Sequence, residues 1–286
     1  MDLLLHDATT MPLDRPVIMG ILNLTPDSFF DGGRYTDPKQ AVDHGLAMAS
    51  QGADIIDVGG ESTRPGANRI DPAEQVARVV PVIRTLRQRL DSSFARTQIS
   101  IDTTLGEVAQ AAVDAGARVL NDVSAGREDP GMLELAAKRS LPIVLMHMQG
   151  EPTTMQDHPT YSDVVAQVKD FLLERAQAAL DAGVDRRQII LDPGIGFGKT
   201  TGHNLALLRA VPLLADLGYP IMIGASRKRF LGDYGLPDRG GGDRLGGTCA
   251  VTAHCVAMGV ALLRVHDVSA NRSAADLAWA LSRPDG

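Results

Sequence analysis

The chain has 286 residues, of which 44% are hydrophobic, enough to bury a large core. This length allows one or two domains, because a closed α/β barrel takes about 250 residues as one unit. The formal net charge of −7 gives no electrostatic reason to expect nucleic acid or an anionic membrane as a partner.

Short apolar segments alternate with amphipathic segments along the chain. We predict strands at about residues 17–23, 54–58, 98–102, 118–122, 142–147, 188–192, 220–224 and 260–267. We predict helices at about residues 37–51, 71–90, 104–115, 130–139, 161–182, 202–217, 245–258 and 269–281. Continuous apolar runs are typical of parallel strands that are buried on both faces. Eight such units favour a single-domain (β/α)8 TIM barrel over residues 1–286, without an internal repeat or a linker.

Cysteine usage and apolar content indicate where the protein works. Cys249 and Cys255 are six residues apart in a helical pattern and point to different faces, which suits neither a disulfide framework nor a metal pair. The N-terminus lacks the basic region of a signal peptide. The longest apolar stretches are far shorter than the about 20 residues that span a bilayer. We therefore expect a cytoplasmic protein.

Polar side chains follow the predicted strands, at the point where each strand ends. They are Asn23, Asp57, Glu61, Asp102, Asn121, Asp122, His147, Asp192, Lys228, Arg264 and His266. In a barrel all of these strand ends meet on one face, and that face carries the active site. A single aspartate after a strand is often only a helix cap, but a series over all eight strands indicates a site.

Two kinds of side chain share this predicted face. The hydrogen-bond acceptors are Asp102, Asn121 and Asp192, and the donors or cations are Thr63, Arg64, Lys228, Arg264 and His266. Carboxylates that accept two parallel hydrogen bonds suit a flat heterocycle rich in N–H groups. The cations suit a multiply charged anion such as diphosphate. Aromatic residues are scarce, so we expect the guanidinium of Arg264 to supply a flat stacking face.

The glycine-rich stretch 194–200 resembles a phosphate-binding loop but has the wrong spacing. A P-loop needs four residues between its first glycine and Gly-Lys-Thr, and Pro193 stands at the position of that first glycine. We predict instead a tight turn after the sixth strand, whose glycines let the backbone pass close to a ligand.

Several long motifs together resemble the dihydropteroate synthase family. They are NLTPDSF at 23–29, DGG at 31–33, GGESTRPG at 59–66, DPGIGFGK at 192–199, SRK at 226–228 and RVHD at 264–267. The resemblance implies a (β/α)8 fold and a step of folate synthesis. In that step para-aminobenzoate displaces diphosphate from hydroxymethyl-dihydropterin diphosphate and gives dihydropteroate. It also implies Mg2+ as the cofactor, a homodimer, and membership of a family that is a target of sulfonamides.

The resemblance also implies a role for individual residues. Asp102, Asn121, Asp192 and Lys228 would hold the pterin; Asn23, Thr63, Arg64, Arg264 and His266 would hold the diphosphate or its Mg2+, with Asn23 as the metal ligand. Phe29, Pro65 and Ser226 would line the para-aminobenzoate site, and Asp27 and Asp31 would belong to the mobile first loop. The residues assigned to catalysis are Asp31, Arg64, Lys228, Arg264 and His266. Phe30 and the glycines at 240–242 depart from the family pattern.

Other interpretations of these residues and of the whole chain stay open at this point. His147 is interpreted as structural, Asp57 as a residue that orients the second loop, and the tripeptide 227–229 as either a basic surface turn or part of the site. A pterin-binding methyltransferase would share the barrel and the pterin group, but not the diphosphate residues. A non-catalytic pterin-binding paralogue would lose the Mg2+ and phosphate residues, which this chain retains.

Overall fold

The computed structural model describes residues 2–25, 37–61, 69–150, 154–234 and 244–283. Eight parallel strands form one sheet in the spatial order β8-β7-β6-β5-β4-β3-β10-β9. The strands are β3 Val17–Asn23, β4 Ile55–Gly59, β5 Gln98–Asp102, β6 Val119–Asp122, β7 Ile143–Met146, β8 Ile189–Asp192, β9 Met222–Ile223 and β10 Leu262–Val265. A parallel bridge between Leu191 and Ile221 joins the two ends of the sheet. The predicted barrel is therefore confirmed.

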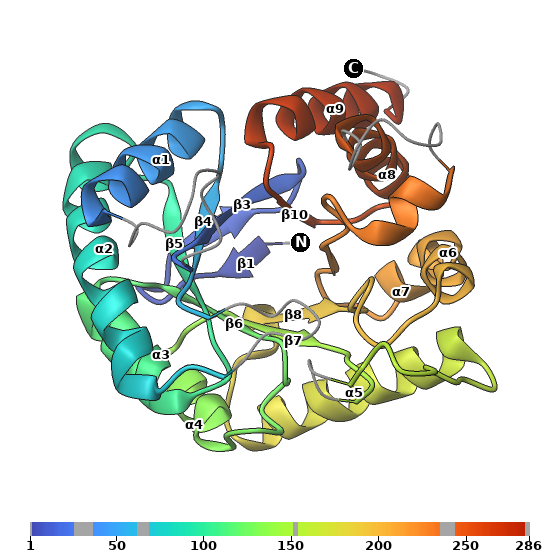
Figure 1. The fold of residues 1–286 in the computed structure, drawn as a ribbon, viewed down its shortest axis with the longest axis horizontal. Helices are drawn as coiled ribbons and strands as arrows, with labels where there is room; N and C mark the ends of the chain where they lie inside the picture. The colour runs from blue at the N-terminus through green and yellow to red at the C-terminus, as the bar shows by residue number, and fades with distance from the viewer. Residues whose placement is uncertain (1, 26–36, 62–68, 151–153, 235–243, 284–286) are drawn as a thin grey trace.

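Helices surround the strands (Figure 1). They are α1 Pro38–Ser50, α2 Pro72–Ser93, α3 Gly106–Ala115, α4 Gly131–Arg139, α5 Val164–Asp181, α6 Thr201–Arg209, α7 Val211–Ala215, α8 Leu245–Ala257 and α9 Val268–Leu281, with 3-10 turns at Arg186–Gln188 and Arg229–Tyr234. Aspartates cap three of these helices: Asp37 accepts from Lys39 N at 3.0 Å, and Asp71 and Asp163 act in the same way. No described helix combines the length and the apolar composition needed to cross a membrane.

The single helix expected over residues 202–217 is wrong, because the chain forms two helices there. Helix α6 ends at Arg209 and α7 begins at Val211, and Ala210 between them is the cap residue of both. Pro212 lies in the first turn of α7. Proline has no N–H and its ring clashes with the carbonyl four residues earlier, so it favours the first turn of a helix and disfavours the interior.

The core has two parts, one on each side of the strands. Side chains that point outward from the barrel pack against the helices, as Ile18, Leu22 and Ile56 do. Inside the barrel, a separate apolar cluster fills the end where the strands begin. Its strand members are Val17, Met19, Ile55, Val144, Ile190, Met222 and Leu262.

An N-terminal hairpin, which the sequence did not reveal, completes the inner cluster. Strand β1 Asp2–Leu4 pairs with β2 Thr10–Pro12 in antiparallel fashion. Leu3 and Leu5 of this hairpin are buried in the same cluster as the inward-facing strand residues, and β1 lies across the middle of the ring in Figure 1. The hairpin closes the N-terminal end of the barrel, so the polar interior is confined to the C-terminal half.

Candidate active site

Polar side chains from five strands meet in the C-terminal half of the barrel. The register aligns Asp57 with Ser100, Gly59 with Asp102, Asp102 with Asn121, Met146 with Asp192, and Arg264 with Met19. Residues aligned across neighbouring parallel strands point to the same face of the sheet. The sequence prediction that these strand ends converge is thus confirmed for Asp57, Asp102, Asn121, Asp192 and Arg264. Two predicted members act elsewhere: Asp122 accepts from Ser124 N and Gly126 N in the turn after β6, and Glu61 accepts from Ile70 N and Gln75 Nε2.

Arg264 is the centre of an ionic network that spans the barrel. Its Nε donates to Asp57 Oδ2 at 2.7 Å, and its Nη2 donates to Asp102 Oδ2 at 2.6 Å. Asn121 Nδ2 donates to the same oxygen of Asp57 at 2.9 Å. Asp57 was expected to orient the loop that follows its strand. Most of that loop lies outside the described residues; among the described residues, Asp57 binds Arg264 and Asn121, and it is fully buried.

The network leaves acceptor atoms without a protein partner. Among the described residues, Asp57 Oδ1 and Asp102 Oδ1 are buried and accept no hydrogen bond, and the hydroxyl of Ser100 has no partner either. Since the amide nitrogen of Asn121 is used by Asp57, the amide oxygen of Asn121 is the group left for a ligand. Unsatisfied buried acceptors favour a ligand that brings N–H donors.

Burial and neighbouring charges set the protonation of this network. Burial raises the pKa of Asp102 to about 7, and the guanidinium of Arg264 opposes this rise. The carboxylates of Asp57, Asp122 and Glu61 add to it. Burial alone would lower the pKa of Arg264, but Asp57 and Asp102 raise it above its usual value, so the guanidinium stays charged. Asp102 is therefore the member of the network whose protonation changes near neutral pH.

Asp192 ends β8 on the opposite side of the barrel from Asp57. Its Oδ1 accepts from Gly194 N at 2.7 Å. Burial raises its pKa, while the Gly194 N–H and the charges of Lys228, Arg264 and Lys199 oppose this rise. None of these three cations comes within ion-pair distance of Asp192 in the described structure. This carboxylate can accept hydrogen bonds from a ligand.

The side chain of Lys228 is half-buried against the turn after β8. Its Nζ donates to the carbonyl of Ile195 and lies 4.1 Å from the centroid of the Phe197 ring. Burial lowers its pKa to about 7; Asp192 opposes that change, and Arg264 adds to it. The preceding residue, Arg227, instead turns outward to Asp267, with Nε donating to Oδ2 at 2.9 Å.

Ser226 and His266 lie together where β9 and β10 end. The Ser226 hydroxyl oxygen accepts from His266 N at 3.1 Å and lies 3.0 Å from His266 Nδ1. Asn23 ends the neighbouring β3. A Cβ atom added to Gly59 would lie 3.4 Å from Asn23 Oδ1 and 3.6 Å from Asp102 Cβ. Glycine at position 59 therefore keeps the space between Asn23 and Asp102 open.

The other predicted site residues lie outside the described residues. They are Asp27, Phe29, Asp31, Thr63, Arg64 and Pro65, as are Phe30 and the glycines at 240–242. The structure thus brings together all the predicted pterin residues, and Asn23, Ser226, Arg264 and His266 of the remainder.

The tight turn predicted after β8 is confirmed, and its glycines are required by contacts within the protein. Gly194, Gly196 and Gly198 all have positive φ, at 68°, 82° and 60°. A Cβ at Gly194 would lie 1.8 Å from the carbonyl oxygen of His147, and one at Gly196 would lie 2.6 Å from Lys228 Cδ. The turn packs so closely against the end of β7 and against Lys228 that no side chain fits at these positions.

Sequence reasoning assigned no role to Lys199, which the structure places beside the site. Its Nζ lies 2.9 Å from His147 Nδ1, and the side chain is buried. Burial lowers the pKa of His147 to about 3, and Lys199 and Arg127 lower it further, so the imidazole is neutral. No serine, threonine or cysteine side chain forms a hydrogen bond with His147 in the described structure, which agrees with a structural role. The only sequence signal for Lys199 is its place at the end of the glycine-rich motif.

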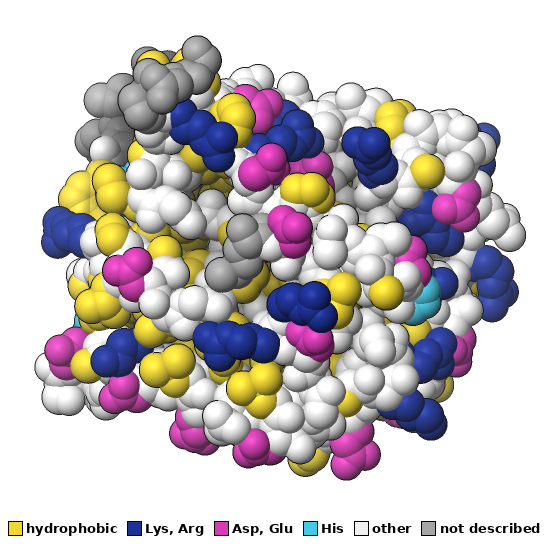
Figure 2. All heavy atoms as spheres, turned by 180° about the vertical axis from the view of Figure 1, so that it is seen from behind, with side chains coloured by type: hydrophobic (Ala, Val, Ile, Leu, Met, Phe, Trp, Pro, Cys, Tyr) yellow, Lys and Arg dark blue, Asp and Glu magenta, His cyan; other side chains and the backbone are white. Residues whose placement is uncertain are grey.

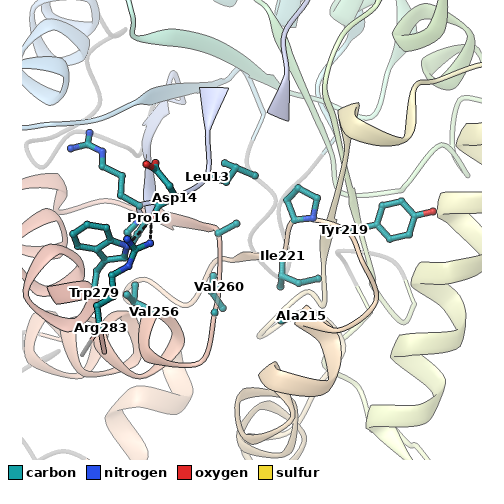
Figure 3. A pocket seen from close by; sticks show the side chains of 14 residues that line it. Leu13, Asp14, Pro16, Ala215, Tyr219, Ile221, Val256, Val260, Trp279 and Arg283 are labelled. Atoms are coloured by element: carbon teal, nitrogen blue, oxygen red, sulfur yellow. Dashed lines mark hydrogen bonds between the residues drawn. The ribbon is translucent and has the colours of Figure 1, made fainter. Parts of the chain in front are cut away.

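A cavity of about 270 Å3 lies at the opposite end of the barrel. Pro16, Ile221, Ala261 and Trp279 are among the residues that line it (Figure 3). The first three precede β3, β9 and β10, so this hollow is at the N-terminal end of the strands. It is therefore separate from the polar cluster and is not the candidate active site.

Comparisons with known proteins agree with this geometry. The family model for pterin binding enzymes matches residues 19–266. The dihydropteroate synthase of Mycobacterium leprae is 46% identical over 285 residues, covering 96% of this chain and 97% of its own length. The Escherichia coli dihydropteroate synthase is 42% identical over 265 residues, covering 93% and 91%.

Solved structures give the same result. Yersinia pestis dihydropteroate synthase in a sulfonamide drug complex superposes with a TM-score of 0.90 at 40% identity, covering 98% of this chain and 99% of that one. The Xanthomonas albilineans dihydropteroate synthase with 4-aminobenzoic acid gives 0.86 at 45% identity, covering 98% and 97%. With its fold, its strand-end residues and its near full-length similarity in agreement, the chain belongs to the pterin-binding enzyme family and, within it, to the dihydropteroate synthases.

Proposed function

We propose that this protein condenses hydroxymethyl-dihydropterin diphosphate with para-aminobenzoate to give dihydropteroate and diphosphate. The observation that carries the proposal is the set of inward-facing acceptors on Asp102, Asn121 and Asp192 beside the cations Arg264 and Lys228. A pterin presents N–H donors along one edge, and these acceptors match them. The acceptors would thus bind the donors of the pterin, and the cations would bind the anion.

Asp57 prepares Asn121 for this recognition. Because the Asn121 amide nitrogen donates to Asp57 at 2.9 Å, the amide is held with its oxygen free to accept from a ligand. Asp102 Oδ1 and the second oxygen of Asp192 add further acceptors. Three acceptors fixed in advance favour a ligand whose edge carries several donors, and disfavour one that carries acceptors there.

The reaction breaks the bond between the pterin methylene carbon and the diphosphate oxygen, and forms a bond from that carbon to the aniline nitrogen. The diphosphate leaves with the electron pair, and the nitrogen releases a proton to solvent. Negative charge grows on the leaving group, where Arg264 and His266 would stabilise it. Positive charge on the methylene and ring is stabilised by Asp102 and Asp192, with Asp31 as a further carboxylate from the first loop.

The residues present fit a Mg2+ ion that arrives with the diphosphate. Among the described residues there is no group of three or more His, Cys, Asp or Glu side chains that could hold a metal ion. Mg2+ commonly takes one or two protein oxygens and completes its shell with substrate phosphates and water. The amide oxygen of Asn23 is the protein ligand we propose, and the bound ion would neutralise charge on the leaving diphosphate.

The loop residues keep the roles that the family motifs imply. We propose that Thr63 and Arg64 bind the diphosphate, and that Phe29 and Pro65 join Ser226 at the para-aminobenzoate site. Two wider features complete the proposal: a cytoplasmic location, which suits two cysteines that form no disulfide, and assembly as a homodimer.

Exposed apolar side chains support assembly as a homodimer. Leu213 on α7 is 47% exposed, and Leu277 and Leu281 on α9 are 63% and 78% exposed. Hydrophobic side chains also gather along the left side of the face shown in Figure 2, whereas charged side chains of both signs are interspersed over the rest. Sedimentation equilibrium tests this point: a monomer mass at micromolar concentration would contradict it.

The experiment that tests the reaction is diphosphate release from the pterin diphosphate, with and without para-aminobenzoate. We expect release that depends on para-aminobenzoate and Mg2+, and dihydropteroate as the product by mass spectrometry. Binding of the pterin without release would support the non-catalytic paralogue. Transfer of a methyl group from a methylated pterin to a corrinoid would support the methyltransferase.

A further inference from the structure

Lys199 is a buried cation that the proposed reaction leaves without a role. It ends the turn after β8, and only 3% of its surface is exposed. A lysine is rarely buried to this extent unless its ammonium is held by specific partners. The contacts of Lys199 show which groups hold its ammonium.

All three donors of the Lys199 ammonium are used within the protein. Its Nζ lies 2.9 Å from His147 Nδ1, 2.9 Å from the carbonyl oxygen of Phe197 and 3.4 Å from that of His147. An ammonium cannot accept, so His147 Nδ1 is the acceptor and the imidazole carries its proton on Nε2. In the described structure no carboxylate pairs directly with Lys199.

These bonds join the turn after β8 to the end of β7. The turn holds Lys228 in two ways: the carbonyl of Ile195 accepts from its Nζ, and the Phe197 ring lies 4.1 Å beneath it. Lys199 thus fixes the backbone of Phe197, and the Phe197 ring in turn positions the ammonium of Lys228. Tyr161 tethers the same turn without a charge, because its hydroxyl donates to the carbonyl of Gly198 at 2.8 Å.

The charge of Lys199 also acts on Asp192. The charged groups that face Asp192 are Lys228 after β9, Arg264 on β10 and Lys199 in the turn after its own strand. The groups that face Lys199 are His147, Asp192 and Lys228. Burial lowers the pKa of Lys199 to about 7; Asp192 opposes that change, and Lys228 adds to it. Below neutral pH Lys199 is a cation and stabilises the ionised form of Asp192.

We propose that Lys199 is a positioning residue for the pterin half of the site: with His147 as its acceptor it ties the turn to β7, fixes Phe197 beneath Lys228, and supports the Asp192 carboxylate by its charge. The inference rests on the proposed function, because it takes Asp192 and Lys228 to bind the pterin. The inference adds Lys199, which does not contact the proposed pterin, to the residues that determine the affinity for the pterin and the pH dependence of that affinity.

The test compares Lys199→Met with Tyr161→Phe, which removes a tether of the same turn and no charge. Calorimetry with 6-hydroxymethylpterin gives the affinity of each protein across a series of pH values. We expect Lys199→Met to weaken binding about tenfold or more, on the scale of one lost interaction with a charged group. Without the Lys199 charge the pKa of Asp192 rises, so we expect the acidic limb of the binding curve to move to higher pH. Tyr161→Phe should leave that limb in place.

A pair of substitutions at His147 provides the second measurement. His147→Asn keeps an acceptor near the position of Nδ1, whereas His147→Leu removes it. We expect the asparagine variant to retain most of the pterin affinity and the leucine variant to lose it. This comparison decides the question if Lys199→Met does not fold, as judged by circular dichroism.

The outcomes separate the possible failures. If the acidic limb of the Lys199→Met curve stays at the wild-type pH, or if Tyr161→Phe moves that limb equally, the proposed role of the charge is overturned. Equal pterin affinities for the two His147 variants would overturn the proposed tie between the turn and β7. If the wild-type protein binds the pterin but releases no diphosphate, the proposed reaction fails while the comparison of variants still stands.

Discussion

Replacing Asp57 by asparagine tests the network beneath the proposed pterin site. The carboxylate is fully buried, and its Oδ2 accepts from Arg264 Nε at 2.7 Å and from Asn121 Nδ2 at 2.9 Å. The amide oxygen of asparagine can accept from both donors, but it carries no charge to balance the Arg264 guanidinium, and the bond from Asn121 becomes a neutral one. A hydrogen bond to a charged group contributes about 1.5–3 kcal/mol, and a neutral one about 0.5–1.5 kcal/mol. The Asn121 bond therefore loses about 1 kcal/mol, and the ion pair with Arg264 loses about as much or more, so we expect a total loss of at least about 2 kcal/mol.

The same substitution should weaken pterin binding, because Asn121 is then held less firmly in its acceptor orientation. We expect about a tenfold loss of affinity, which corresponds to about 1.4 kcal/mol. Urea denaturation followed by circular dichroism gives the stability, and calorimetry with 6-hydroxymethylpterin gives the affinity.

Ser100→Ala is the matched control. Ser100 is aligned with Asp57 on the next strand and is equally buried, yet its hydroxyl has no partner among the described residues. Removing an unpaired buried hydroxyl should change stability by less than about 0.5 kcal/mol or increase it. An Asp57→Asn protein with wild-type stability and affinity, or an equal loss in Ser100→Ala, would refute the argument.

Three further predictions concern the ligand. Asp192→Asn places an NH2 group against the pterin donors, so calorimetry should show a loss of at least about 2 kcal/mol, and unchanged affinity would reject the assignment. His266→Ala should weaken binding of the pterin diphosphate and leave the bare hydroxymethylpterin nearly unaffected; equal losses would argue against a role at the leaving group. Because the pKa of Lys228 is lowered to about 7, its ammonium is lost as pH rises through that value. Affinity for the pterin diphosphate should fall over the same range, and Lys228→Arg should remove that fall; an unaltered curve would contradict the role of Lys228.

Periodic patterns predicted the barrel because its strands are buried on both faces and its helices are amphipathic. The polar strand ends were predictable for the same reason: Asp102, Asn121 and Asp192 interrupt apolar runs at the point where each strand must stop. The break at Pro212 was present in the sequence and was overlooked. The predicted features are those that neighbouring residues alone determine.

Other features depend on partners that are distant in the sequence. Asp57 has its role through Arg264, 207 residues later, and Asn121, 64 residues later. Lys199 is buried because His147, 52 residues earlier, offers a lone pair at the right place. The N-terminal hairpin is too short to carry a clear pattern, and its leucines become core residues only because the barrel is open beneath them.

That hairpin also controls the dielectric environment of the site. Ile55 belongs to the apolar layer that the hairpin closes, and it lies on the same face of β4 as Asp57, one layer below it. Because this apolar layer excludes water below Asp57, the attraction between Asp57 and Arg264 acts through protein. Through solvent the attraction would be several times weaker. By packing into this apolar layer, Leu3 and Leu5 strengthen the ion pair by which Asp57 holds Arg264.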